Sequence, residues 1–62
     1  MTVTIQTHSG DLRSVKMTNE QFAKYDHLMG MARYYEQQGM DIEWHDHFVE
    51  ALQLFNNIYT NN

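Results

Sequence analysis

The chain begins with a short run in which apolar and polar residues alternate with period two, as in a β-strand. This run, residues 2–7, is rich in β-branched side chains, and residues 12–17 are predicted to form the return strand. Between them, Ser9-Gly10-Asp11 has turn chemistry, because glycine tolerates positive φ and aspartate bonds its own backbone. The pattern predicts a β-hairpin over residues 2–17.

The register of this β-hairpin follows from the position of the turn. A three-residue turn at residues 9–11 pairs positions whose numbers sum to 20, and it places the apolar side chains of both strands on one face. The predicted pairs are Val3 with Met17, Ile5 with Val15, and Thr7 with Arg13. A two-residue turn would scatter the apolar side chains, so we favour the three-residue turn.

A helix is predicted from residue 19 to residue 38. Thr18 and Gln21 have the spacing of a capping box, and Met17 and Phe22 occupy the positions of a hydrophobic staple. At the other end, Gly39 fits the left-handed position that follows a helix. The apolar positions repeat with helical period between these two signals.

A second helix is predicted over residues 41–60. From Trp44 onward its apolar residues share one arc of a helical wheel. Its start is less well defined by the pattern, because Asp41 or Asp46 could cap it and residues 40–42 could instead be extended.

Together these elements predict a single small α+β domain over residues 1–62, with an N-terminal β-hairpin packed on a C-terminal two-helix hairpin (ββαα). The predicted core combines the apolar strand face with apolar helix positions. Its members are Val3, Ile5, Val15, Met17, Phe22, Tyr25, Leu28, Met29, Phe48, Leu52 and Phe55.

Composition narrows the classes of protein that remain. The chain has no cysteine and no proline, so disulfides and cysteine–zinc staples are excluded. No apolar run reaches the roughly 18 residues of a membrane span, and the first residues lack the features of a secretory signal. We therefore expect a cytoplasmic protein that does not bind membranes, and its net charge of −4 argues against direct nucleic-acid binding.

The negative charge is confined to one segment. Residues 1–39 hold four acidic and four basic side chains, whereas residues 40–62 hold four acidic side chains and no Lys or Arg. On a helix, Glu43, Asp46 and Glu50 fall within an arc of about 60°. This ridge could dock on a basic surface of a partner, or it could be a solvated face that keeps the protein soluble.

A metal site is a weaker hypothesis. Glu43, His47 and Glu50 share one helix face, but His45 points about 160° away from His47 on the same wheel. The alternative is that His47 pairs with its flanking carboxylates, which would make the ridge respond to pH. We expect no metal and no cofactor.

Enzymatic chemistry has little support in the sequence. There is no cysteine nucleophile, no Gly-x-Ser-x-Gly elbow and no glycine-rich phosphate loop. A chain of 62 residues also has little room for a deep pocket that excludes water. We expect that the protein is not an enzyme.

A second candidate surface lies on the first helix. Ala23, His27, Gly30 and Tyr34 recur at helical spacing on its polar side, which combines small residues with an aromatic anchor. Gly30 costs roughly 1 kcal/mol relative to alanine in a helix interior. Either this strip contacts a partner, or the second helix or a second copy of the chain packs closely over Gly30.

The leading hypothesis is a non-enzymatic interaction protein that docks on a larger partner and inhibits or modulates it. In its sharper form, Glu43, Asp46 and Glu50 mimic nucleic-acid charge and occupy the basic groove of a nucleic-acid enzyme, as small inhibitors carried by phages and mobile elements do. One alternative is a structural homodimer or assembly component that uses Tyr34. The other is a metal- or pH-responsive module around His47.

Overall fold

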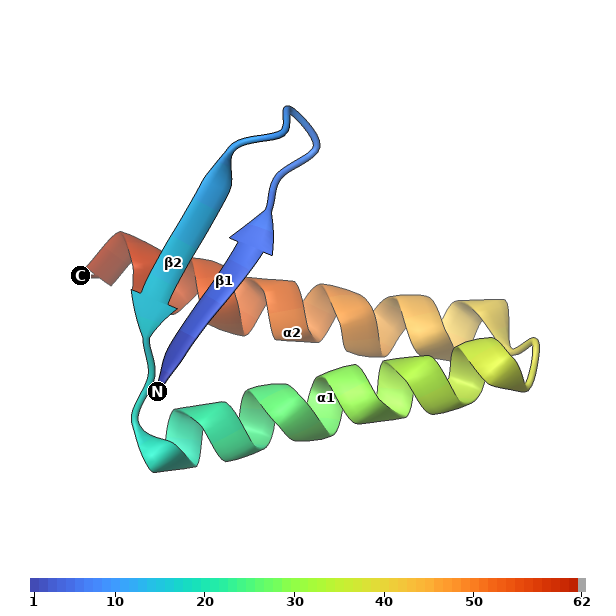
Figure 1. The fold of residues 1–62 in the computed structure, drawn as a ribbon. Coiled ribbons are helices and arrows are strands. Elements are labelled where there is room, and N and C mark those ends of the chain that lie inside the picture. Colours follow the sequence, from blue (N-terminus) through green and yellow to red (C-terminus); the bar gives the residue numbers. More distant parts are fainter. Residues whose placement is uncertain (62) are drawn as a thin grey trace.

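The computed structural model describes residues 1–61 and contains the predicted ββαα arrangement. Two antiparallel strands, β1 (Thr2–Gln6) and β2 (Leu12–Lys16), precede two helices, α1 (Asn19–Gln37) and α2 (Asp41–Asn61). The helices lie side by side as one layer, and the β-hairpin crosses in front of α2 with its turn extending beyond that layer (Figure 1). Among residues 1–61, no helix combines the length and apolar character needed to cross a membrane.

The register of the β-hairpin differs from the prediction. Val3 pairs with Val15 and Ile5 pairs with Arg13, so paired numbers sum to 18, not 20. The connection between the strands spans residues 7–11, and its turn lies one residue earlier than predicted. The Thr7 N–H donates to the Asp11 carbonyl (2.8 Å), which continues the observed register, and the Thr7 carbonyl accepts from the Gly10 N–H (2.9 Å). Side chains alternate with period two, so a shift of two leaves the apolar face unchanged.

Both ends of α1 carry the predicted signals. The Gln21 N–H donates to Thr18 Oγ1 (3.1 Å), and the Thr18 N–H donates to Gln21 Oε1 (2.9 Å), which confirms the capping box. At the other end Gly39 has φ of +74°, and the Met40 N–H donates to the Tyr35 carbonyl (2.9 Å). This Schellman arrangement ends the helix one residue earlier than predicted.

The start of α2 differs from either proposed cap. The Trp44 N–H donates to the Met40 carbonyl (3.0 Å), which places Met40 at the capping position. Asp41 is therefore the first helical residue, where its carboxylate favours the helix dipole, and Asp46 lies more than a turn inside. The extended alternative for residues 40–42 is wrong.

The core is narrower than predicted. Val15 and Met17 of the β-hairpin region pack with Phe55 and Ile58 of α2, and Phe55 is completely buried. Small residues allow the helices to approach, and Ala51 is also completely buried. Ala32, Ala51 and Ile58 were not in the predicted core.

Several residues predicted for the core lie at its margin. Met29, Phe48 and Leu52 are only half-buried. Five-residue strands span about 17 Å, whereas helices of 19 and 21 residues span about 30 Å. The β-hairpin therefore covers only part of the helical layer, and these side chains border an uncovered part.

Candidate functional site

The acidic ridge, defined as Glu43, Asp46 and Glu50, lies along one side of α2. Asp46 and Glu50 are exposed, and Glu43 is half-buried. Their spacing spans about 10 Å along the helix axis, given its rise of 1.5 Å per residue. The fold thus presents two of the three predicted carboxylates freely to a partner.

The fold also brings a basic side chain to one end of the ridge, which the division of charge along the sequence does not reveal. Lys24 of α1 and Glu50 line the same surface hollow, together with Gln53 and Asn57 of α2. A lysine here reduces the local negative potential around Glu50. The negative charge of the ridge is therefore least compensated toward the start of α2, around Asp46.

The His47 side chain is fixed by a hydrogen bond to the backbone and by contact with an aromatic ring. Its Nδ1 lies 2.9 Å from the Glu43 carbonyl oxygen, and its ring lies 5.2 Å from that of Tyr35. Because a carbonyl oxygen only accepts, Nδ1 carries the proton and donates it. The hydrogen bond is thus made to backbone, where the sequence suggested pairing with a carboxylate.

The structure gives no support to the metal-site hypothesis. Across residues 1–61, no group of three or more His, Cys, Asp or Glu side chains is arranged to hold an ion. With Nδ1 of His47 occupied, that histidine could offer only Nε2.

The Tyr34 strip, defined as Ala23, His27, Gly30 and Tyr34, lies on the outer side of α1, opposite the positions that face α2. All four residues are exposed, and Tyr34 is 54% exposed. Among residues 1–61, a Cβ added at Gly30 would meet no atom within 4 Å apart from the adjacent backbone of α1 itself. The interpretation that α2 packs closely over Gly30 is therefore wrong.

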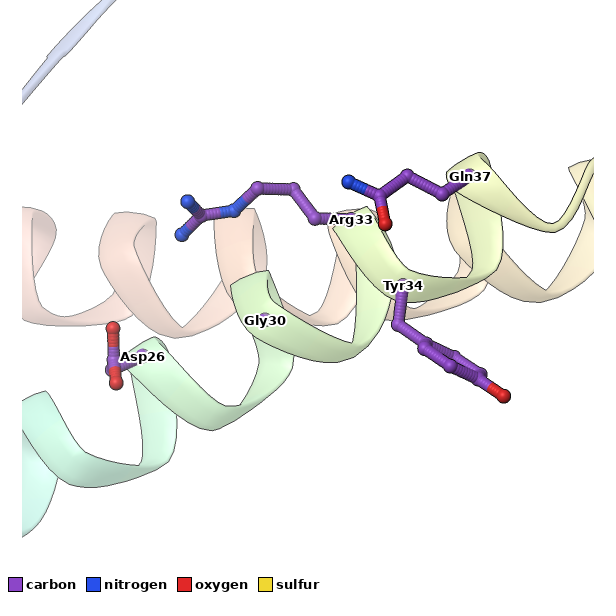
Figure 2. A pocket seen from close by; sticks show the side chains of 5 residues that line it. All are labelled: Asp26, Gly30, Arg33, Tyr34 and Gln37. Carbon is purple, nitrogen blue, oxygen red and sulfur yellow. The ribbon is translucent and has the colours of Figure 1, made fainter.

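The surroundings of Tyr34 form a shallow hollow on α1. Figure 2 shows Tyr34 projecting from one side of Gly30 while Arg33 and Gln37 extend on the other. The Tyr34 ring packs edge-on against the Tyr35 ring, with centroids 5.4 Å apart. The structure does not join this strip to the acidic ridge, because the strip lies on the side of α1 that faces away from α2.

A third feature, missed by the sequence analysis, is an apolar cleft between the β-hairpin and the helical layer, with a volume of about 380 Å³. Its apolar wall comes from β1 and both helices. Its lining residues are Ile5, Gln6, Thr7, His8, Arg13, Tyr25, Met29, Phe48, Leu52 and Asn56. The mismatch in length between strands and helices is the signal that could have revealed it.

Two side chains shape the cleft electrostatically. Burial raises the pKa of the Tyr25 hydroxyl, and the positive charge of Arg33 partly opposes that rise. Tyr25 therefore stays neutral at physiological pH. Arg13 lies at the edge of the β-hairpin with its guanidinium carbon 5.1 Å from the centre of the Tyr59 ring.

Comparisons with known proteins do not assign the chain to a family. No family model matches it, and neither the curated proteins nor the solved structures include a match.

Proposed function

We propose that this protein is a non-enzymatic interaction module that docks the acidic ridge of α2 on a basic surface of a larger partner. The observation that carries the proposal is the one-sided charge of α2, which holds four acidic side chains and no Lys or Arg. The exposure of Asp46 and Glu50 supports it, because a docking charge must reach its partner.

The favoured partner is a cytoplasmic nucleic-acid enzyme whose basic groove accepts the ridge in place of phosphates. Phosphate charge dominates the affinity of nucleic acid for such grooves, and carboxylates held on a rigid helix supply charge of the same sign. The ridge would then inhibit the enzyme by occupying its binding groove. Small inhibitors carried by phages and mobile elements provide the analogy.

The test compares three forms of the chain. The ridge variant carries Glu43→Gln, Asp46→Asn and Glu50→Gln. A control variant carries Glu20→Gln, Asp26→Asn and Glu36→Gln, three exposed acids of α1, so both variants lose the same charge. Each form is immobilised, partners are captured from the source cells and identified by mass spectrometry, and binding to the purified partner is then measured.

The proposal predicts that the ridge variant loses at least tenfold in affinity while the α1 variant stays within about twofold of the original chain. Added DNA or RNA should displace the original chain from the partner. Equal losses in both variants would mean that net charge alone matters. Unchanged binding by the ridge variant would make the ridge a solubility face.

A homodimer is a second candidate, favoured by the open space over Gly30 beside the exposed Tyr34. A second copy could approach the helix backbone closely at Gly30, with Tyr34 as an aromatic anchor. Sedimentation at high micromolar concentration tests it. The candidate predicts a dimer that Tyr34→Ala dissociates, and monomers in both cases would exclude it.

A further inference from the structure

We propose that the apolar cleft between β1 and the helical layer binds a small amphipathic carboxylate, with an apolar body of about ten carbons and its carboxylate at Arg13. This site is separate from the acidic ridge and does not depend on the proposed function. Three features of the cleft favour this ligand: its apolar walls, its size and its charge.

The walls of the cleft suit an apolar body. Ile5 projects from β1, Tyr25 and Met29 line the side formed by α1, and Phe48 and Leu52 line the side formed by α2. The apolar lining thus comes from three separate elements, β1, α1 and α2. Of the two strands, β1 lies on the side of the connection between the helices (Figure 1). Methionine and aromatic side chains of this kind adapt to apolar ligands.

The size of the cleft suits a small molecule. Its volume of about 380 Å³ lies within the range of small-molecule sites. At about 30 Å³ for each water-sized group, that space holds roughly a dozen non-hydrogen atoms. A saturated carboxylate of ten carbons has a matching number of atoms.

The charge of the cleft selects an anion. The chain has eight acidic and four basic side chains, yet within the described residues 1–61 the cleft lining contains Arg13 and no Asp or Glu. Tyr25 adds no negative charge, because burial raises the pKa of its hydroxyl. An anionic head group therefore meets complementary charge here, in contrast to the acidic side of α2.

Arg13 is positioned to receive that head group. The guanidinium carbon lies 5.1 Å from the centre of the Tyr59 ring, and this cation–π contact uses no N–H donor. A guanidinium held in place can bind a carboxylate through two parallel hydrogen bonds. Arg13 is directly paired with Ile5 across the strands and itself lines the cleft, so its side chain borders the apolar wall.

The test is a titration of the ¹⁵N-labelled full chain, followed by NMR and calorimetry, with decanoate kept below its micelle concentration. Decanol is the neutral ligand of the same length, and butyrate is the short anion. Arg13→Gln removes the cation at an exposed position. Lys16→Gln is the matched control, since Lys16 is an exposed cation on the same strand but on the opposite face.

We expect saturable binding of one decanoate, with shift changes at Ile5, Phe48 and Leu52. Decanol and butyrate should each bind at least tenfold more weakly. Arg13→Gln should remove the preference for decanoate over decanol, and Lys16→Gln should leave it intact. Circular dichroism checks that both variants are folded.

Three results would overturn the inference. The first is the absence of saturable binding by decanoate. The second is equal binding of decanoate and decanol by the original chain. The third is that the chemical shifts of the cleft residues change with protein concentration in the absence of ligand. In that case the cleft would bind a second copy of the chain.

Discussion

The helical pair and the β-hairpin differ in how far their stabilising contacts reach along the sequence. The ends of α1 are fixed by hydrogen bonds between residues three to five positions apart, as at Thr18 and Gly39. The β-hairpin instead depends on a five-residue turn and on the contacts of Val15 and Met17 with α2, some forty residues later. Local hydrogen bonds therefore determine where α1 begins and ends, and tertiary packing determines how the β-hairpin is placed on the helices.

The largest expected effect is the loss of the core that the β-hairpin and the helical pair share. Phe55 is fully buried against Val15 and Met17, so Phe55→Ala should reduce the free energy of unfolding by about 3–5 kcal/mol. A domain of this size has little more than that to lose. Urea denaturation followed by circular dichroism should show a largely unfolded chain.

The control for this prediction is Leu12→Ala, because Leu12 is 73% exposed and should change stability by no more than about 0.5 kcal/mol. If Phe55→Ala released the β-hairpin and left a folded helical pair, the shared core would not couple the two regions.

The second effect tests the register of the β-hairpin. Thr4 Oγ1 and Ser14 Oγ lie 2.8 Å apart, so the double variant Thr4→Cys/Ser14→Cys should form a disulfide. It should stabilise the chain by roughly 2–3 kcal/mol by constraining the unfolded state. The pair Thr4→Cys/Lys16→Cys corresponds to the register expected from a three-residue turn, and faster oxidation of that pair would contradict the structure.

The third effect concerns the end of α1. Gly39 has φ of +74°, where a side chain strains the backbone, so Gly39→Ala should cost about 1–2 kcal/mol. Thermal unfolding measures the loss. A neutral result would mean that the Schellman turn is not needed to reverse the chain.

The fourth effect is the loss of the N-cap. Thr18→Ala removes the acceptor for the Gln21 N–H and should cost about 1 kcal/mol. Thr18→Ser keeps the hydroxyl and should retain most of the stability. Equal losses for both substitutions would attribute the effect to packing of the threonine methyl group.

The smallest expected effect is a gain in stability from filling the helix position of Gly30. Gly30 lies at an exposed position inside α1, where an added Cβ would meet no atom of residues 1–61 within 4 Å beyond the adjacent helix backbone. Gly30→Ala should therefore stabilise the monomer by about 0.5–1 kcal/mol. Chemical denaturation at low protein concentration measures the gain. If Gly30→Ala reduced stability only at high protein concentration, a second copy of the chain would pack over Gly30.

The difference between local contacts and contacts between distant residues also explains which parts of the fold were predictable from the sequence. The capping box at Thr18 and the left-handed Gly39 lie in a few adjacent residues, so the sequence alone locates the ends of α1. The hydrogen bond from the Thr7 N–H to the Asp11 carbonyl continues the observed register, but no pattern in the sequence marks it. Alternation does not distinguish two registers of the same parity.

The candidate surfaces were likewise predictable only where they depend on neighbours within one helix. Helical spacing correctly placed Asp46, Glu50 and Tyr34 on exposed faces, because a helix wheel depends only on local geometry. The position of Lys24 beside Glu50, and the cleft around Phe48, depend on how separate elements pack. No pattern within one element reports such neighbours.

The measurement that tests the central claim most directly is the salt dependence of binding to the purified partner. If the acidic ridge docks on a basic groove, affinity should fall steeply with salt for the original chain and for the α1 control variant, and much less steeply for the ridge variant. Identical salt dependence in the ridge variant and the original chain would contradict the account.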